Sequence, residues 1–390
     1  MPQQLERVVL IGNYAPDKQW SMLNFAEQLR SGLKANKIEV DLWQPQPVFN
    51  RLDSSLPGAI SKWLGYIDKL ILFPRRLKRA ARTLPDNTVF HICDHSNGFY
   101  VPVIKNRPHL ITCHDLMAIL SARGEVPQHQ TGFTGKKLQG YIFAGLTQAE
   151  RIVCDSHSSR ADLIRLIPTV ESGSKVIWLP PPVLPDRLSN SEAQAILSAR
   201  NFPADKPFIL HVGSGAWYKN RIAILQAWQK FRETNDLPNL VFAGGDVTPE
   251  EHTFVQNHEL ESQFFSLTKL ETKELTALYS LASVFCFPSH YEGFGLPPLE
   301  AQSAGCPVVA SHGGSLAEVL EASIVQVDPL SSDSIFVALK QLIDSPEERA
   351  KLIETGHRNA DRFRTYPLID LYINEYREAL TEHQKSTALN

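Results

Sequence analysis

Short runs of β-branched and aromatic residues alternate with amphipathic helical stretches along almost the whole chain. The runs are 7–12, 38–43, 89–92, 110–113, 151–155 and 175–179 in the first half, and 208–212, 240–243, 264–267, 283–287, 307–310 and 324–327 in the second. Strands that alternate with helices predict βαβ units and parallel sheets. The expected fold class is therefore α/β, with doubly wound sheets that bind ligands at the carboxyl ends of their strands.

The alternation stops at a proline-rich segment, residues 180–185, and then restarts. Four prolines in these six positions exclude a helix or a central strand and predict a stiff connector. A chain of 390 residues suits two domains of about 150–200 residues each. We therefore predict Rossmann-like domains over 1–183 and 184–365 that face a cleft, followed by an amphipathic helical stretch over 366–390.

Composition narrows the partners and the compartment. A net charge of −3 argues against a nucleic-acid partner, whose binding surface would be broadly basic. Five cysteines are scattered through apolar runs without metal-type spacing, as expected for small buried side chains in a reducing cytosol. Neither an N-terminal apolar leader nor a run of 18 apolar residues is present, so we expect a cytoplasmic protein.

The segment 289–300, Ser-His-Tyr-Glu-Gly-Phe-Gly-Leu-Pro-Pro-Leu-Glu, has the chemistry of an anion and sugar site. Its two adjacent prolines favour the start of a helix, because proline is tolerated in a first helical turn. Backbone N–H groups near Gly295 and Leu296 would then face an anion such as a diphosphate. Glu292 could accept hydrogen bonds from sugar hydroxyls and Glu300 from a ribose diol. Together these features predict a nucleotide-sugar site.

This segment resembles the Glu-x7-Glu signature of the retaining glycosyltransferases of family 4, which have the GT-B fold. The flanking motifs at 274–279, 305–311 and 318–319 are similar to that family as well, and the resemblance is strong over 205–330. It implies transfer of a hexose from a UDP- or GDP-sugar donor to a hydroxyl acceptor, a saccharide or a lipid-linked saccharide. It also implies that the last helix crosses back to the first domain.

The resemblance extends to a glycine-containing loop after the strand 208–212. Lys219 matches the family's lysine, whereas Ser214 stands where an arginine is common. We expect Lys219 at a helix start, where it stabilises the leaving diphosphate, and Arg221 on that helix to point elsewhere. The resemblance implies three catalytic residues, which are His114, Lys219 and Glu292. The donor-binding residues it implies are Gly12, Gly213, Ser214, Lys219, Leu270, Phe294, Gly295, Leu296 and Glu300.

Polar residues at strand ends mark the first domain. His114 ends one strand and resembles the family's His-Asp motif, which implies a hydrogen bond to the donor sugar, with Asp115 holding the loop. Asp94 and His95 end the preceding strand, where they either line the acceptor side or form an Asx-type helix cap. We also expect Asp115 on the acceptor side. Gly12 closes the first strand, either as a substrate-lining residue or as a plain turn.

A strand-end Asp-x-Asp is absent from the sequence, so we expect neither a metal nor another cofactor. A helix N-terminus and Lys219 would then offset the diphosphate charge. Two alternatives stay open. A GT-B sugar-nucleotide epimerase would share the fold and the nucleotide site, and a non-catalytic sugar-nucleotide-binding subunit would keep the site without turnover.

Residues 62–82 form a basic segment with aromatic residues, holding seven basic residues and one acid. A cationic amphipathic segment with aromatic anchors is typical of an interfacial helix on anionic lipid. The alternative is a helix packed on the first domain with solvated Lys and Arg. Pro74 predicts that this segment breaks into two shorter helices.

Overall fold

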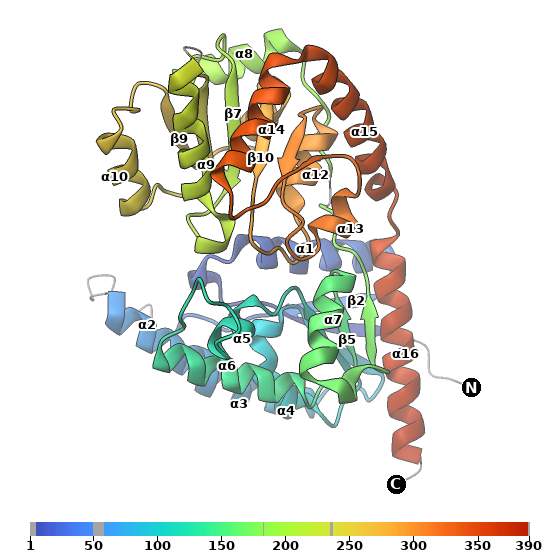
Figure 1. Ribbon diagram of the computed structural model, residues 1–390. Helices are drawn as coiled ribbons and strands as arrows, with labels where there is room; N and C mark the ends of the chain where they lie inside the picture. Colours follow the sequence, from blue (N-terminus) through green and yellow to red (C-terminus); the bar gives the residue numbers. More distant parts are fainter. Residues whose placement is uncertain (1–4, 50–57, 182, 235–236, 389–390) are drawn as a thin grey trace. The chain divides into compact units, whose positions relative to one another are not determined.

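The computed structural model describes residues 5–49, 58–181, 183–234 and 237–388 (Figure 1). The chain divides into two compact units, one comprising Met1–Trp178 with Pro367–Asn390 and the other Leu179–Tyr366. Each unit contains one six-stranded sheet whose neighbouring strands all pair in parallel. The α/β fold class expected from the alternating pattern is confirmed.

The N-terminal unit has the strand order β2-β1-β3-β4-β5-β6. Each expected strand is present: β1 Arg7–Ile11, β2 Glu39–Trp43, β3 Thr88–Ile92, β4 His109–Cys113, β5 Ile152–Cys154 and β6 Ser174–Val176. Its α-helices are α1 Trp20–Ala35, α2 Gly58–Ile67, α3 Phe73–Ala81, α4 Val101–Ile104, α5 Met117–Ala122, α6 Phe133–Leu146, α7 His157–Leu166 and α16 Leu368–Ala388.

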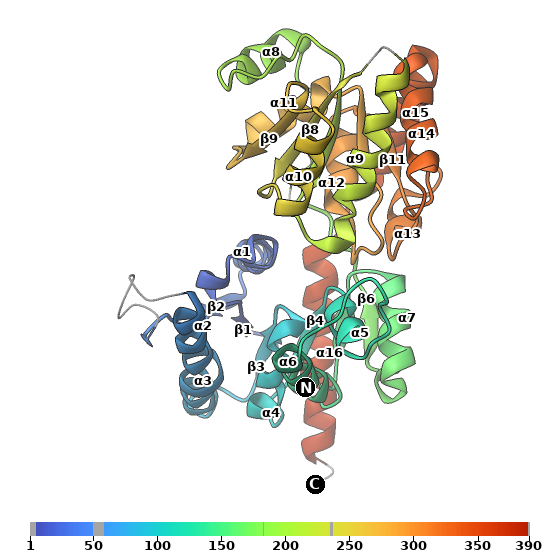
Figure 2. The ribbon, with the colours of Figure 1, turned by 60° about the vertical axis from the view of Figure 1, so that its left-hand side comes forward.

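Side chains alternate between the two faces of this sheet. Val9 and Ile11 belong to a core cluster that includes Phe73 of α3 and Ile142 of α6. The opposite face carries His91, and there α1 and α16 contact the sheet and each other (Figure 2). Because successive residues of a strand point to opposite faces, one short apolar run supplies both layers.

Helix α16 is fastened to this sheet by buried polar contacts. The hydroxyl of Tyr376 lies 2.8 Å from Nδ1 of His91, and Nε2 of His91 lies 2.8 Å from Oγ1 of Thr112. Thr112 in turn contacts the hydroxyl of Tyr372 at 3.0 Å. Buried Arg151 adds three ion pairs to α16, with Glu375 at 2.6 Å, Glu378 at 2.5 Å and Glu382 at 2.7 Å.

The expected break at Pro74 is wrong. Helix α2 continues through a π-helical turn (η3, Asp68–Leu72) directly into α3, whose first turn contains the proline. Proline lacks an N–H donor, which a first helical turn does not need. Asp68 is buried below the turn and accepts hydrogen bonds from the Tyr14 hydroxyl at 3.0 Å and the Phe49 backbone N–H at 3.1 Å.

The C-terminal unit has the strand order β12-β11-β10-β7-β8-β9. Its strands, also as expected, are β7 Phe208–Gly213, β8 Asn239–Gly244, β9 Phe264–Thr268, β10 Val284–Phe287, β11 Val308–Ala310 and β12 Val325–Gln326. Its α-helices are α8 Asn190–Ser198, α9 Arg221–Gln229, α10 Pro249–Asn257, α11 Thr272–Leu281, α12 Leu296–Ser303, α13 Leu316–Leu320, α14 Ser332–Asp344 and α15 Pro346–Arg364.

Both sheets reverse their strand order at one point. In the N-terminal unit β1 has β2 on one side and β3 on the other, and in the C-terminal unit β7 has β8 on one side and β10 on the other. Open parallel sheets bind ligands beyond the carboxyl ends of the strands that flank such a switch point. The strand order therefore directs attention to the loops after β1 and β3 and after β7 and β10.

Candidate active site

Lys219 and Glu292 form an ion pair at the switch point of the C-terminal sheet. Nζ of Lys219 donates to both carboxylate oxygens of Glu292, at 2.8 and 3.0 Å. Both side chains are nearly buried, with 12% and 9% of their surface exposed. Lys219 follows β7 and Glu292 follows β10, so adjacent strands bring together two predicted residues that lie 73 positions apart.

We expected Lys219 at a helix start. It instead ends a 3-10 turn (η6, Trp217–Lys219). Asn220 then adopts a left-handed conformation, φ 58°, and α9 begins at Arg221. The Asn220 side chain donates to the carbonyl of Pro288 at 3.1 Å, which ties this loop to the one that carries Glu292. Nζ of Lys219 lies 4.7 Å from the ring centroid of Phe287, a distance that allows a cation–π interaction.

The backbone at Glu292 is held by a neighbouring glycine loop. The N–H and hydroxyl groups of Ser315 both donate to the Glu292 carbonyl, at 3.0 and 3.1 Å. Gly314 has φ +66°, and a Cβ there would lie 2.2 Å from the same carbonyl oxygen. Only a residue without a side chain allows this approach. The position of Glu292 therefore depends on the loop that precedes α13.

Helix α12 begins directly after the loop that carries Glu292. Its N-cap, Gly295, has φ +95°, and Pro297 and Pro298 lie in the first turn, as the sequence predicted. Glu300 lies one turn further in, and its Oε2 accepts a hydrogen bond from the Tyr279 hydroxyl at 3.0 Å. Burial raises the pKa of Glu300 to about 7, although the Tyr279 hydrogen bond acts in the opposite direction.

The remaining predicted donor residues are placed less uniformly. Gly213 ends β7, and Ser214 is exposed on the loop that leads to Lys219. Leu270 lies after β9, an edge strand two places from β7. Phe294 is buried, and its ring packs edge-on against Phe363 of α15 at 5.8 Å. Phe294 can therefore contact a donor at this loop only through its backbone.

Arg221 points away from the Lys219–Glu292 pair into its own buried environment, as we expected from its place on a helix. Its guanidinium lies 3.1 Å from the Glu251 carboxylate and 4.4 Å from the ring centroid of Phe242. A charge paired in this way is committed to packing α9 against α10.

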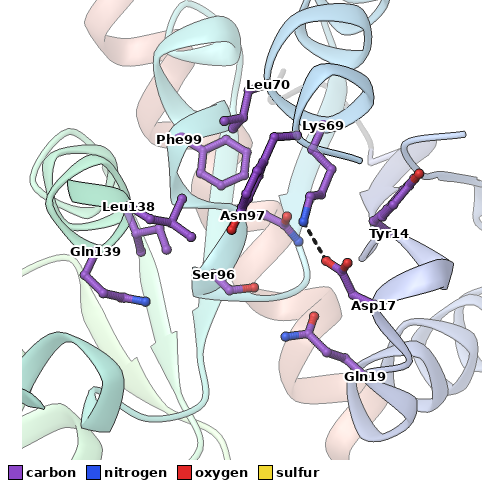
Figure 3. A pocket seen from close by; sticks show the side chains of 12 residues that line it. Tyr14, Asp17, Gln19, Lys69, Leu70, Ser96, Asn97, Phe99, Leu138 and Gln139 are labelled. Atoms are coloured by element: carbon purple, nitrogen blue, oxygen red, sulfur yellow. Dashed lines mark hydrogen bonds and ion pairs between the residues drawn. The ribbon is translucent and has the colours of Figure 1, made fainter. Parts of the chain in front are cut away.

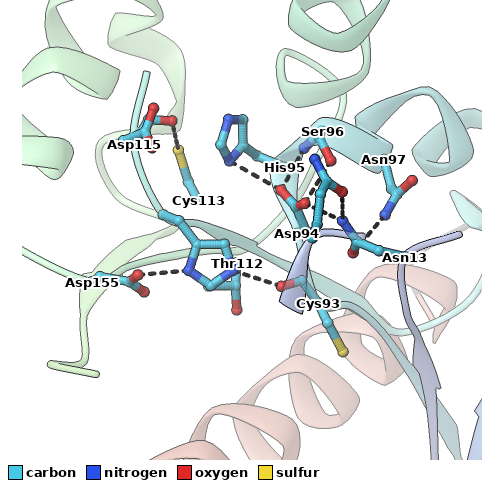
Figure 4. Close-up of polar contacts among 12 residues, drawn as sticks. Asn13, Cys93, Asp94, His95, Ser96, Asn97, Thr112, Cys113, Asp115 and Asp155 are labelled. Atoms are coloured by element: carbon cyan, nitrogen blue, oxygen red, sulfur yellow. Dashed lines mark hydrogen bonds and ion pairs between the residues drawn. The ribbon is translucent and has the colours of Figure 1, made fainter. Parts of the chain in front are cut away.

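A second polar cluster lies at the β1/β3 switch point of the N-terminal unit (Figure 4). Asp94, after β3, accepts hydrogen bonds from the side-chain amide of Asn13 at 2.5 Å and from the backbone and hydroxyl of Ser96 at 2.8 and 2.6 Å. Nδ1 of His95 lies 3.4 Å from the Asp94 carboxylate. Asp94 thus caps the 3-10 helix His95–Tyr100, which is one of its two predicted roles. Its carboxylate also brings Asn13 and Ser96 together at the switch point.

His114, after β4, has both ring nitrogens engaged. Nδ1 lies 2.6 Å from the Asp155 carboxylate, and Nε2 lies 2.9 Å from the carbonyl of Cys93. Two acceptors favour the doubly protonated imidazolium, and although burial opposes the charge, Asp155 raises the pKa of His114 to about 9. A hydrogen bond from its side chain to a donor sugar would require Nε2 to leave the Cys93 carbonyl.

Asp115 and Gly12 have local structural contacts. The Asp115 carboxylate accepts from the Met117 backbone N–H at 2.9 Å and so holds the start of α5, as the resemblance implied. A Cβ on Gly12 would lie 3.0–3.1 Å from the side chains of Gln44 and Leu42, so the glycine fits a close approach to the end of β2 and to the residue that follows it.

The sequence analysis did not single out several residues that contribute to these clusters, among them Asn13, Asp155, Tyr279 and Ser315. Asp155 ends a predicted strand, so its strand-end position was an available signal. Asn13, Tyr279 and Ser315 act through partners distant in sequence.

Among residues 5–49, 58–181, 183–234 and 237–388, the structure has no group of three or more His, Cys, Asp or Glu side chains arranged to hold a metal ion. In the same ranges, no helix is both long and apolar enough to cross a membrane.

Comparison with known proteins shows which proteins this chain resembles. Residues 193–359 match the family model of the glycosyl transferases group 1. The O-antigen chain mannosyltransferase B of Escherichia coli is 28% identical over 311 residues, 79% of this chain and 78% of that protein. The MMP alpha-(1->4)-mannosyltransferase of Mycolicibacterium hassiacum is 43% identical over 95 residues, 23% of each chain.

Solved structures show the same architecture. Sucrose-phosphate synthase from Thermosynechococcus elongatus superposes with a TM-score of 0.75 at 20% identity, over 97% of this chain and 99% of that one. HepE from Anabaena, in complex with UDP-glucose, superposes with a TM-score of 0.68 at 13% identity, over 97% and 99%. Residues 193–359 therefore match the glycosyl transferases of group 1, and the two parallel sheets of the chain have the expected GT-B fold.

Proposed function

We propose that this chain is a retaining hexosyltransferase that moves a hexose from a UDP- or GDP-linked donor to a hydroxyl group of a saccharide or lipid-linked saccharide. The observation that carries the proposal is the Lys219–Glu292 ion pair at the β7/β10 switch point, in which Glu292 lies on the loop that ends at the N-cap of α12. A cation, a carboxylate and a helix N-terminus at the carboxyl ends of neighbouring strands suit the binding of a diphosphate joined to a sugar.

The proposed reaction breaks the bond between the anomeric carbon and the donor phosphate oxygen. The bonding electrons move onto the diphosphate, where Lys219 and the N–H groups at the start of α12 stabilise the charge. The acceptor oxygen bonds to the anomeric carbon on the face that the diphosphate leaves, which retains the configuration. The acceptor proton passes to the departing phosphate oxygen, so the chain need not supply a covalent nucleophile.

Glu292 has a separate role in this proposal. A carboxylate beside the departing sugar accepts hydrogen bonds from its hydroxyls, and such contacts contribute most as positive charge develops at the anomeric carbon. Glu300 accepts from the ribose diol. We also propose that the reaction needs no metal, because Lys219 and the α12 N-terminus supply positive charge where a metal would act.

The relatives indicate which donors to test first. Three are named mannosyltransferases, and HepE was crystallised with UDP-glucose. A screen of UDP- and GDP-linked mannose and glucose for nucleotide release, with a cell extract as the source of acceptors, identifies the donor. Mass spectrometry then identifies the product, and its anomeric coupling constant distinguishes retention from inversion. Inversion would contradict the mechanism.

The same screen separates the alternatives. Release of a free, altered sugar without an acceptor would indicate the epimerase instead. Donor binding without single turnover in any extract would indicate a non-catalytic subunit. Activity that disappears in excess chelator and returns with Mg²⁺ or Mn²⁺ would contradict the metal-free proposal.

We also propose that this protein acts in the cytoplasm and contacts the membrane surface through residues 62–82. The side chain of Lys62, the first residue of this segment, is not among the side chains that the structure describes. Trp63 has 66% of its surface exposed and Ile71 43%, whereas Phe73 and Leu77 pack into the core. The exposed cations of α3 are Arg75, Arg76, Lys78 and Arg79. Flotation with anionic but not neutral vesicles, lost when these four become Glu, would support the contact, and absence of flotation at low salt would refute it.

A further inference from the structure

The N-terminal unit contains a cavity of about 170 Å³ that none of the predicted site residues lines (Figure 3). Its wall comes from the loop after β1, from η3, from the 3-10 helix after β3 and from α6. The lining residues used below are Asp17, Lys69, Ser96, Asn97, Phe99 and Gln139. At about 30 Å³ per water molecule, this volume corresponds to roughly six waters, a size that suits one sugar ring better than a disaccharide.

We infer that this cavity, which we call the acceptor pocket, binds a single neutral hexose unit of the acceptor. The inference rests on the proposed function and specifies its acceptor. Phe99 and Leu138 supply apolar surface, whereas Gln139, Asn97 and Ser96 supply amide and hydroxyl groups. An apolar wall with a few oriented polar groups is the usual composition of a ligand pocket, and it fits the two kinds of surface on a sugar ring.

Charge balance indicates that the bound unit is neutral. Nζ of Lys69 donates to Asp17 at 2.7 Å and lies 4.9 Å from the ring centroid of Tyr66 and 5.5 Å from that of Tyr14. Asp17 and Lys69 are the one acid and the one base among the residues that line the pocket in the described structure. An anionic acceptor would have to displace Asp17 from Lys69 and leave that carboxylate unpaired.

The π-helical turn η3 accounts for the position of Lys69. Tyr100 donates from its hydroxyl to the Lys69 carbonyl at 2.9 Å, and Asp68 is buried next to it with Tyr14 as a partner. The turn thus directs Asp68 into the unit while Lys69 and Leu70 line the pocket. Isolated π turns inside α-helices are frequent at functional sites.

A continuous set of hydrogen bonds joins the pocket to the β1/β3 switch point. Asn97 donates to the side chain of Asn13 at 3.1 Å, and Asn13 donates to Asp94 at 2.5 Å. Ser96, which also lines the pocket, donates to Asp94 at 2.6 Å. A hexose in the pocket would therefore lie next to the Asp94–His95 strand end, where ligands of such sheets bind.

Ligand-observed saturation-transfer NMR on the full chain tests the inference, with methyl α-D-mannopyranoside, methyl α-D-glucopyranoside and methyl α-D-galactopyranoside as neutral probes. At least one should show transfer from the wild type. Gln139→Ala should weaken that binding about 3- to 10-fold, the range for one lost hydrogen bond. Tyr141→Ala is the matched control, because Tyr141 lies on the same helix, is 68% exposed and does not line the pocket. Phe99→Leu provides a second variant that keeps an apolar side chain.

Charge provides the discriminating experiment. D-Mannose 6-phosphate should bind the wild type at least 10-fold more weakly than the best neutral probe. Asp17→Asn, which leaves Lys69 without its carboxylate, should narrow that gap about tenfold. Tighter binding of the phosphate by the wild type, or equal effects of Gln139→Ala and Tyr141→Ala, would overturn the inference. UDP and GDP titrations on the same samples keep the outcomes distinct: nucleotide binding without glycoside binding refutes this inference alone, whereas loss of both refutes the proposed function.

Discussion

The Tyr279 hydroxyl donates a hydrogen bond of 3.0 Å to the Glu300 carboxylate, joining the last turn of α11 to the second turn of α12. Burial raises the pKa of Glu300 to about 7, and the hydrogen bond counteracts part of that rise. The protonation state of a residue predicted to bind ribose therefore changes near neutral pH. Tyr279 acts on the site through Glu300 and is a positioning residue.

Nucleotide affinity should increase as the pH rises through about 7. A carboxylate accepts from a ribose diol more strongly than the protonated acid does, and the acid predominates below the raised pKa. Calorimetric titration of UDP and GDP between pH 5.5 and 8.5 measures this dependence. Glu300→Gln should make the profile flat and cost about 1.5–3 kcal/mol of binding at the alkaline end. Tyr279→Phe should move the midpoint to higher pH, and an unmoved midpoint would exclude the positioning role.

Lys219→Ala should lower turnover about 10²- to 10³-fold, the range for losing one preorganised electrostatic stabiliser. Lys273→Ala, which removes an exposed lysine of α11, is the control and should leave turnover unchanged.

Glu292→Gln should reduce turnover more than it reduces nucleotide affinity, because its sugar contacts strengthen in the transition state. Steady-state kinetics with the identified donor, combined with calorimetry, separates the two effects.

Gly314→Ala should impair activity without unfolding the chain. The added methyl group would lie 2.2 Å from the Glu292 carbonyl at a φ of +66°, so the loop that carries Glu292 must shift. The matched control is Gly140→Ala in α6, where a Cβ meets nothing within 4 Å. That change should stabilise the helix by about 0.5–1 kcal/mol. Equal activity of the two variants would mean that the Gly314 loop does not position Glu292.

The His114–Asp155 pair should make stability depend on pH. The pKa of His114 is about 9 in the folded chain, against 6.5 for an imidazole free of burial and charged partners as in the unfolded chain, so its stabilisation is fully present below pH 6.5 and is lost as the pH rises through 9. The loss should be about 3 kcal/mol over that interval. Asp155→Asn should lower the melting temperature at pH 6 and flatten the dependence. Asp86→Asn, at a fully exposed side chain, should change neither.

Arg151→Ala should loosen α16 from the N-terminal sheet. Glu378 and Glu382 are about half exposed and contribute little, about 0–1 kcal/mol each. The buried partner Glu375 would remain as an uncompensated charge, which costs about 3–5 kcal/mol. Faster amide hydrogen exchange along α16 would report the change, whereas Arg377→Ala, on the exposed surface of the same helix, should leave exchange unaltered.

Local patterns predicted the strands because the residues that form a strand are neighbours in sequence. The start of α12 at Pro297 and Pro298 was predictable for the same reason. The partner of Lys219 was not, because 73 residues separate it from Glu292 and only the strand order makes them adjacent. Tyr279 and Glu300 belong to different helices, and nothing in either helix specifies the other.

The π turn at Asp68–Leu72 had no such local signal. Pro74 predicted a break because a proline interrupts a regular α-helix. The helix continues instead because a buried carboxylate, Asp68, receives donors from Tyr14 and Phe49, and these contacts fix an irregular turn. For His114, the strand-end position predicted a ligand contact, but the acceptors that engage both of its nitrogens come from other strands.

The return of the chain to its first unit has a consequence for biosynthesis. Domains generally fold in the order in which they are made. Here His91 and Thr112 contact each other, but their tyrosine partners, Tyr376 and Tyr372, lie in the last helix. One face of the N-terminal sheet therefore stays partly open while residues 179–366 are synthesised, and a ribosome that stops at Tyr366 releases a first unit in which that face has α1 but lacks α16. The buried contacts of β3 and β4 are complete only when translation has reached the last helix.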